Sequence, residues 1–567
     1  MTRPIRAHLA SLAGAACLAG CGSTDPMIVE IDTAQGPVAG QVSERGVADF
    51  RAIPYAAPPV GDLRWRPPAP APRWTETRQA MEFSPMCMQS TDGPSAILDR
   101  LVDGIGVSAA KRFLIKRIAA AQDSGEVSED CLYLNVRTPE PSAGADLPVM
   151  VWIHGGGHQF GSADFSIYQG DDLPARGVVL VTINYRLNAF GYMAHPALSA
   201  ESGDGASGNY GLRDQIAALE WVRDHITGYG GDPGNVTVFG ESAGASSIAA
   251  LIASPRADGL FARAIMESGE ATQSFTTLRG DSRGPSAETV GEAIMAALPG
   301  APATVEDMRA LDASDILNAV DFDTHSGTLR PIGDGVMLPA SVPELLARGD
   351  IRAMPAIVGY NADEAGIFYD GPENARLRPD LGTDDAGEQL AELQRVYGEA
   401  AGAEIARLYD IDGPDNHFFD VRDLMGDEYF GLSTRFVLER LEAEGAPVWA
   451  YAFTRVPPSD SQTIGAFHSA EMPFVFGTHE PALGLSEEDE ALTDLMQAYW
   501  VSFARDGDPN APGLPGWPRY GGSNWMEFTA NTGGRSGAIR DWRKAKLDAL
   551  EAGLDPVLLS VPVEVDN

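Results

Sequence analysis

Three uninterrupted apolar runs constrain the fold of this chain more than any other feature. They are Val149–Ile153, Val178–Ile183 and Val236–Phe239, and the last two contain one threonine each. A strand that is apolar on both sides must be covered on both sides, as parallel strands are between layers of helices. Segments with helical periodicity follow at 212–225 and 243–253. The pattern therefore predicts an α/β chain with a central, mostly parallel sheet flanked by helices.

The remaining elements are expected on both sides of this centre. Short β-rich runs separated by turn residues predict an antiparallel N-terminal edge, with strands at 27–31, 38–41, 50–53 and 132–137. Later strands are expected at 264–266, 356–358 and 448–453. Two regions rich in Ala, Leu, Glu and Arg, near 270–350 and 370–445, are typical of helical insertions.

Composition excludes several classes of protein. Of the 567 residues, 44% are hydrophobic and 21% are charged, which excludes disordered and fibrous chains. With 41 basic and 80 acidic side chains the net charge is −39, so a nucleic-acid partner is not expected. We expect a single domain over residues 21–567. Nothing in the sequence indicates an oligomeric state.

The first twenty residues are typical of a secretory signal. Arg3 and Arg6 precede an apolar stretch that is too short to span a bilayer, and a Leu-Ala-Gly-Cys sequence ends at Cys21. That ending resembles the lipobox of bacterial lipoproteins, in which the cysteine is lipidated and becomes the N-terminus. We therefore expect an exported, lipid-anchored protein of the bacterial cell envelope, held at the membrane only through Cys21. The alternative is a plain signal peptide.

Two other cysteines, Cys87 and Cys131, remain in the predicted mature chain. In an oxidising compartment they form a natural pair, and two buried free thiols are the alternative. Between them, residues 96–121 predict an apolar, locally basic helix. It is read first as a packed surface helix, with a lid or a membrane-touching helix as alternatives.

The sharpest motif is Gly-Glu-Ser-Ala-Gly at residues 240–244. It follows a predicted strand and opens an Ala-rich helix, which is the setting of a nucleophile elbow. The turn is tight, so a Cβ on either glycine would collide with neighbouring atoms. The hydroxyl of Ser242 would stand beside a helix N-terminus, where developing negative charge is favoured. We predict Ser242 as a nucleophile, the alternative being a serine that caps the helix.

A serine nucleophile needs a base, and in α/β-hydrolases an acid and then a histidine follow the serine along the chain. His468 lies on a loop after a late predicted strand, whereas His417 lies within a helical insertion and is read as solvated. His468 is the predicted base, with a structural histidine as the alternative. Asp363 and Glu364 both follow an intermediate strand, and spacing alone does not choose between them as the acid.

A run of three glycines between two histidines, residues 154–158, directly follows another predicted strand. Such a run lets the backbone approach a substrate and supplies oxyanion-hole amides, joined by the amide of the residue after the nucleophile, Ala243. Histidines four apart on a helix can instead hold zinc. A triple glycine does not form a helix, however, and no third ligand lies nearby in the sequence. No metal or cofactor is expected.

In combination these motifs resemble the type B carboxylesterases, the carboxylesterase and cholinesterase family of the α/β-hydrolase superfamily. The likeness extends over roughly residues 27–545. It rests on these stretches: Ile53–Ala56, Pro58–Gly61, Glu129–Val136, Asn184–Arg186, Gly208–Gln215, Phe239–Gly244, Ser268–Gly269, Asp363–Glu364 and His468–Gly477.

The resemblance implies an α/β-hydrolase fold and an enzyme that cleaves a small-molecule carboxylic ester through an acyl-serine intermediate. The residues that it assigns are a triad of Ser242, Glu364 and His468, oxyanion donors at Gly156, Gly157 and Ala243, and a disulfide between Cys87 and Cys131. Ala365 interrupts the family's Asp-Glu-Gly stretch, and His158 stands where many members carry an aromatic residue.

Two other functions are weighed against the esterase. A lipase for longer-chain esters is supported only by the segment at 96–121. A non-catalytic, cholinesterase-like binding protein would not need the complete set of serine, histidine, acid and glycine run that this sequence retains.

Overall fold

The computed structural model describes residues 27–559 with some short gaps. The gaps are 91, 123–124, 281–283, 321–324, 326, 370–380, 382, 384, 412–416, 460, 480–484 and 532–533. The predicted signal and Cys21 therefore lie outside the described residues, as does the side chain of His417.

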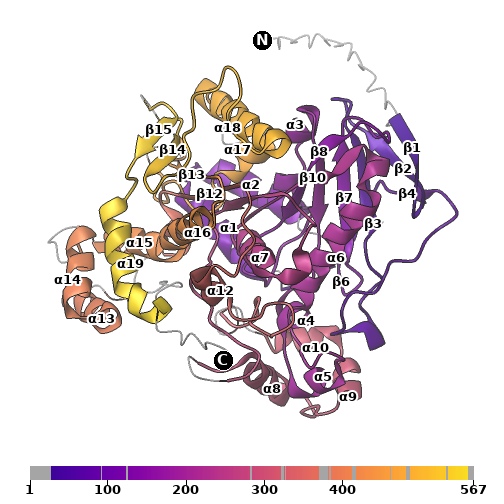
Figure 1. The fold of residues 1–567 in the computed structure, drawn as a ribbon, viewed down its shortest axis with the longest axis horizontal. Helices are drawn as coiled ribbons and strands as arrows, with labels where there is room; N and C mark the ends of the chain where they lie inside the picture. The colour runs from indigo at the N-terminus through magenta and orange to yellow at the C-terminus, as the bar shows by residue number, and fades with distance from the viewer. Residues whose placement is uncertain are drawn as a thin grey trace, which may run out of the picture.

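One large sheet runs through the described part of the chain. Its 13 strands follow the order β1-β2-β3-β7-β9-β8-β10-β11-β12-β13-β14-β15, with β4 paired to β2. The strands are β1 (Met27–Thr33), β2 (Gly36–Val42), β3 (Ala48–Pro54), β4 (Arg78–Gln79), β7 (Tyr133–Thr138), β8 (Leu147–Ile153), β9 (Val179–Ile183), β10 (Gly231–Glu241), β11 (Arg263–Glu267), β12 (Ala356–Asn361), β13 (Val448–Phe453), β14 (Asn524–Phe528) and β15 (Gly537–Arg540). In Figure 1, β1 and β2 lie at the right of the molecule and β14 and β15 at the left.

The sheet is parallel at its centre and antiparallel at both edges. Every pair from β9 through β8 and β10 to β14 is parallel. Five pairs at the edges are antiparallel, namely β1–β2, β2–β3, β3–β7, β7–β9 and β14–β15. A separate parallel pair, β5 (Met86–Cys87) and β6 (Val127–Ser128), lies outside this sheet. The predicted α/β-hydrolase architecture with an antiparallel N-terminal edge is confirmed.

Helices connect the strands and form the insertions. They are α1 (Asp92–Gly104), α2 (Ala109–Gln122), α3 (Asp172–Ala175), α4 (Asn188–Tyr192), α5 (Pro196–Glu201), α6 (Tyr210–His225), α7 (Ala243–Ala253), α8 (Ala287–Ala297), α9 (Val305–Arg309), α10 (Ala313–Asn318), α12 (Val342–Arg348), α13 (Ala386–Tyr397), α14 (Glu399–Leu408), α15 (His417–Gly426), α16 (Leu432–Ala443), α17 (Met472–Phe476), α18 (Glu487–Asp506) and α19 (Lys544–Leu559). Figure 1 shows α13 and α14 beside α19 at one end. No described helix combines the length and the apolar character that a bilayer span requires.

Two hydrophobic cores explain why the central strands are apolar on both faces. Along β8, Val149, Val151 and Ile153 belong to a core that includes side chains of α6, α7, α12 and α16. The alternate residues Met150 and Trp152 belong to a second core that includes side chains of α17 and α18. Successive side chains of a strand point to opposite faces, so each face of the sheet is covered by its own helices.

The sequence predictions for individual elements were right at the centre and incomplete at the C-terminal edge. The predicted helix at 243–253 and strand at 448–453 match α7 and β13 residue for residue. Strands β14 and β15 were not predicted. Asn524 and Glu527 are only partly buried in β14, so this strand lacks the continuous apolar run by which the central strands were found.

The expectation of one helix at 96–121 was wrong, because two helices, α1 and α2, occupy this region. The helical conformation is interrupted between them at Gly106, whose φ of +75° is left-handed. A Cβ at Gly106 would lie 2.6 Å from the carbonyl carbon of Ser461, so glycine is needed where the turn approaches another segment. The disulfide that closes this loop, between Cys87 and Cys131, is confirmed.

Candidate active site

The turn that carries Ser242 connects β10 to α7. Ser242 has φ 57° and ψ −123°, a conformation that L-residues adopt only when their surroundings impose it. A Cβ on Gly240 would lie 2.6 Å from the Ile153 carbonyl oxygen, and a Cβ on Gly244 would lie 1.9 Å from it. Both glycines are therefore required so that the turn can sit against β8. The strained strand–turn–helix geometry is that of a nucleophile elbow.

His468 and Glu364 meet at the same edge of the sheet. His468 Nδ1 lies 2.6 Å from Glu364 Oε2. The other oxygen, Oε1, accepts from the backbone amide of Asn361 at 2.7 Å and from the Ser268 hydroxyl at 2.5 Å. Glu364 is fully buried, so these bonds fix the carboxylate that orients the imidazole.

The neighbouring carboxylate takes a different position. Asp363 Oδ2 accepts from the Ala466 amide at 2.7 Å, and its Oδ1 lies 3.7 Å from Arg422. Asp363 therefore stabilises the loop that leads to His468 and does not contact the His468 ring. The geometry favours Glu364 over Asp363 as the orienting acid, a choice that spacing in the sequence left open.

A second carboxylate contacts the base from the other side. Glu241 Oε1 lies 3.0 Å from His468 Nε2 and accepts from the Ser469 hydroxyl at 2.5 Å. Burial by itself would lower the pKa of His468, but Glu241 and Glu364 outweigh it and hold the pKa well above its usual value. The structure records no hydrogen bond between Ser242 Oγ and His468 Nε2, two described groups. Such contacts often tighten only when substrate is bound.

Sequence reasoning did not single out Glu241. The available signal was its place in the motif, because it is a carboxylate directly before the predicted nucleophile and at the end of an apolar strand. A charged side chain at such a buried position needs a partner.

Two more buried carboxyl groups, those of Glu471 and Glu267, lie close to Glu241. Glu471 accepts from Asn361 Nδ2 at 2.5 Å, and burial together with Glu241 raises its pKa to about 8. Glu267 accepts from the Trp500 indole at 2.7 Å, and burial together with Glu471 raises its pKa well above the usual range. Burial and the neighbouring carboxylates therefore favour the protonated form of both groups.

The glycine run after β8 lies against the nucleophile turn. A Cβ on Gly155 would lie 3.0 Å from the Cβ of Ser242, and one on Gly156 would lie 2.1 Å from the Phe160 carbonyl oxygen. Gly156 and Gly157 have φ of +103° and +61°. The close approach of Gly155 to Ser242 places this loop beside the turn from which Ala243 opens α7.

The two histidines that flank the glycines do not converge on a common point. His154 Nδ1 is hydrogen-bonded to the Gly155 carbonyl at 2.9 Å, and burial lowers the pKa of His154 to about 4. His158 Nε2 is bonded instead to the hydroxyl of Ser247 at 3.0 Å. Among the described residues, no group of three or more His, Cys, Asp or Glu side chains is arranged to hold a metal ion.

The hairpin formed by α1 and α2 packs on the segments that carry His468 and Glu364. Ile105 forms a small hydrophobic cluster with Ile367 and Ile464, which flank the Glu364 turn and the His468 loop. The Ser461 hydroxyl also donates to the Gly106 carbonyl at 2.9 Å. Phe113, on α2, is 69% exposed.

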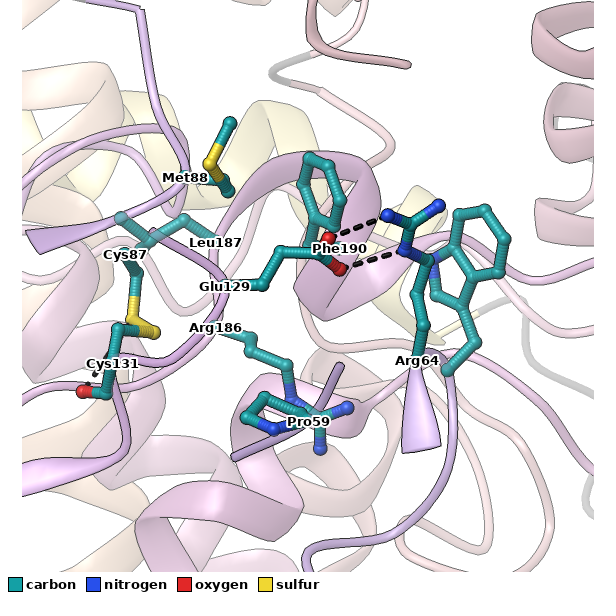
Figure 2. A pocket seen from close by; sticks show the side chains of 10 residues that line it. Pro59, Arg64, Cys87, Met88, Glu129, Cys131, Arg186, Leu187 and Phe190 are labelled. Carbon is teal, nitrogen blue, oxygen red and sulfur yellow. Dashed lines mark hydrogen bonds and ion pairs between the residues drawn. A yellow bond between two sulfur atoms is a disulfide. The ribbon is translucent and has the colours of Figure 1, made fainter. Parts of the chain in front are cut away.

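A small cavity beside the disulfide is separate from these groups. Figure 2 shows its lining, in which Arg64 forms an ion pair with Glu129 near Cys87 and Cys131. Its volume is about 10 Å³, room for a single water molecule. None of the predicted triad residues lines it.

The chain is similar to carboxylesterases in sequence and in fold. The model of the carboxylesterase family matches residues 27–546. The chain is 35% identical over 512 residues to a protein of Sphingopyxis macrogoltabida named fumonisin B1 esterase, covering 88% of this chain and 85% of that one. It is 35% identical over 542 residues to carboxylesterase 1E of Mus musculus, covering 90% and 91%. Among solved structures, carboxylesterase EST55 of Geobacillus stearothermophilus superposes with a TM-score of 0.74 and 31% identity, covering 92% of this chain and 99% of that one.

Proposed function

The chain belongs to the carboxylesterase family and hydrolyses carboxylic esters, and on this premise we propose that Ser242, His468 and Glu364 form its catalytic triad. The observation that carries the proposal is the bond of 2.6 Å between His468 Nδ1 and Glu364 Oε2, at the same sheet edge as the elbow that presents Ser242. Asp363 contacts other groups and has no place in the triad.

In the proposed reaction, Ser242 Oγ attacks the ester carbonyl while His468 Nε2 takes the hydroxyl proton. Glu364 keeps the imidazole in the required tautomer and stabilises the imidazolium. The amides of Gly156, Gly157 and Ala243 donate to the oxyanion of the tetrahedral intermediate. His468 returns the proton to the departing alcohol, and a water molecule activated by the same base then releases the acid from Ser242.

We propose a small-molecule carboxylic ester as the substrate. A lipase for longer-chain esters is the second candidate, and one observation favours it. The α1–α2 hairpin packs on the segments that carry Glu364 and His468 and exposes Phe113, as a cover over the site would.

A series of p-nitrophenyl esters from acetate to palmitate tests both the triad and the chain length. Ser242→Ala should lower kcat by several orders of magnitude, since the triad acts as a unit. Glu364→Gln should lower kcat roughly a thousandfold or more, because the amide supports the wrong imidazole tautomer. The matched control Asp363→Asn should cost far less.

The results separate the alternatives. Near-normal turnover in Ser242→Ala would disprove the mechanism, and a larger loss in Asp363→Asn than in Glu364→Gln would move the acid by one residue. Fast turnover of short esters favours a carboxylesterase. A preference for palmitate favours the lipase.

We further propose that the protein is exported and lipid-anchored in the bacterial cell envelope through Cys21, after removal of residues 1–20 as a signal peptide. The lipobox-like sequence that ends at Cys21 supports this proposal. The disulfide between Cys87 and Cys131 also supports it, because disulfides persist in oxidising compartments.

A further inference from the structure

His158 closes the glycine run in a backbone conformation that is uncommon for residues other than glycine. Its φ is +61°, so that Gly156, Gly157 and His158 are three consecutive left-handed residues, of which only the last carries a Cβ. His158 is also 2% exposed. A non-glycine residue holds such a backbone conformation only where its surroundings compensate for the strain.

The ring of His158 is held by a hydrogen bond to α7. Its Nε2 lies 3.0 Å from Ser247 Oγ on α7. The same hydroxyl accepts from Gln215 Nε2 at 3.0 Å, so Ser247 Oγ contacts both α6 and the ring of His158. A backbone hydrogen bond with Ala243 also acts on the ring and raises its pKa.

The electrostatic setting keeps this arrangement neutral. Burial lowers the pKa of His158 well below its usual value, and the positive charge of Arg330 and the nearby His154 lower it further. The main chain of His158 is held as well, since its carbonyl accepts from the Asn188 amide at 2.7 Å.

We propose that His158 is a positioning residue that holds the oxyanion-hole loop in register with the first turn of α7. The backbone of His158 directly follows Gly156 and Gly157, and its ring bonds to Ala243 and Ser247 in that turn. One side chain therefore joins the two segments whose amides would bind the oxyanion. The proposal rests on the oxyanion donors proposed above.

The expected consequence is specific to the transition state. Oxyanion donors act only if they are fixed before charge develops, and a displacement of about 1 Å can cost a hundredfold in rate. Loosening the loop should therefore lower kcat while KM changes little, because the ground-state ester makes weaker contacts there.

The test compares His158→Phe with Ser247→Ala in the full-length protein. His158→Phe keeps a ring of similar size and loses both bonds, and kcat for p-nitrophenyl acetate should fall roughly ten- to a hundredfold. Ser247→Ala removes the hydroxyl that bonds to the ring and leaves His158 in place, so it remains informative if the bulkier variant does not fold. The double variant should lose little more than the worse single variant, since both changes break one connection.

A trifluoromethyl ketone inhibitor provides a readout that a purely structural role would not move. Its adduct carries the oxyanion, so its inhibition constant should weaken in proportion to kcat/KM in each variant. His158→Gln, which can both accept and donate, should recover part of the loss. His479→Phe is the matched control, because His479 also bonds to a hydroxyl, that of Thr493 at 2.8 Å, and should leave kcat unchanged.

Two outcomes would overturn the proposal. If His158→Phe or Ser247→Ala lowers the unfolding temperature but leaves kcat and inhibitor affinity intact, the ring is only structural. If KM rises and kcat holds, the ring acts on substrate binding. Failure of the triad itself is recognised separately, because Ser242→Ala would then retain activity whatever the result at His158.

Discussion

At the scale of single residues, the site depends on how buried charges are paired. His468 lies between Glu364, 2.6 Å from Nδ1, and Glu241, 3.0 Å from Nε2. Two carboxylates on one imidazole favour its charged form, yet a base must be neutral to accept a proton. Glu241 therefore opposes the function of His468 in the resting protein, and we expect it to set the pH at which the enzyme becomes active.

The change Glu241→Gln tests this expectation. With the raised pKa, His468 loses its proton, and activity rises, only as pH increases through that pKa. Glutamine still accepts from Ser469 but removes one negative charge, so the pKa falls and the acid limb of kcat/KM should move to lower pH. The control is Glu527→Gln, because the Glu527 carboxylate also accepts from a hydroxyl, that of Thr454 at 2.9 Å. An unchanged acid limb in Glu241→Gln would contradict the assignment.

At the scale of elements, the α1–α2 hairpin connects the disulfide loop to the catalytic edge. At the turn, Ile105 packs with Ile367 and Ile464, and the Ser461 hydroxyl donates to the Gly106 carbonyl. From α1, Arg100 donates to the Ile367 carbonyl at 3.4 Å, and the Gly104 carbonyl accepts from the Thr463 amide at 2.9 Å. The turn and the end of α1 together therefore hold the hairpin on the loop before His468.

The change Gly106→Ala should disturb that contact. Its left-handed φ and the 2.6 Å approach to Ser461 leave no room for a methyl group, so the hairpin must shift. We expect kcat/KM to fall severalfold and the α1–α2 turn to become more sensitive to limited proteolysis. Gly144→Ala is the matched control, because Gly144 also has positive φ and no atom lies within 4 Å of its added Cβ. Equal effects in both variants would show that backbone strain alone is responsible.

At the scale of the whole molecule, charge and shape limit how the protein meets a membrane. A net charge of −39 repels anionic lipid, and no described helix is suited to cross a bilayer. Attachment through acyl chains on Cys21 would not depend on either property. The catalytic domain would then stand at the membrane surface on a short N-terminal segment.

The change Cys21→Ser tests the anchor in cells that express the full chain. The wild-type protein should incorporate labelled palmitate and fractionate with membranes, and the variant should lose the label and become soluble. Cys17→Ser is the control, because Cys17 would be removed with the signal peptide and its loss should leave labelling intact. A wild-type protein found unlabelled in the soluble fraction would contradict the proposal.

The elements that local sequence specifies were predicted well. The elbow at Ser242 and the glycine run at 155–157 depend on a few adjacent residues, since glycine is required wherever a turn packs against a neighbouring strand. The central strands were likewise legible, because burial on both faces leaves a continuous apolar run. Strands β14 and β15 lack that run, and the break in 96–121 at Gly106 depends on an approach to Ser461.

The charge pairing of the site could not be read in the same way, because its partners are far apart in the chain. Glu364 and His468 are 104 positions apart, and His158 and Ser247 are 89 positions apart. Folding alone brings Glu364 rather than Asp363 to the imidazole, and it alone places Glu241 on the opposite nitrogen. Residue types and turn chemistry are local properties, whereas distance and burial, which set each pKa and each hydrogen bond, arise only when separate segments pack together.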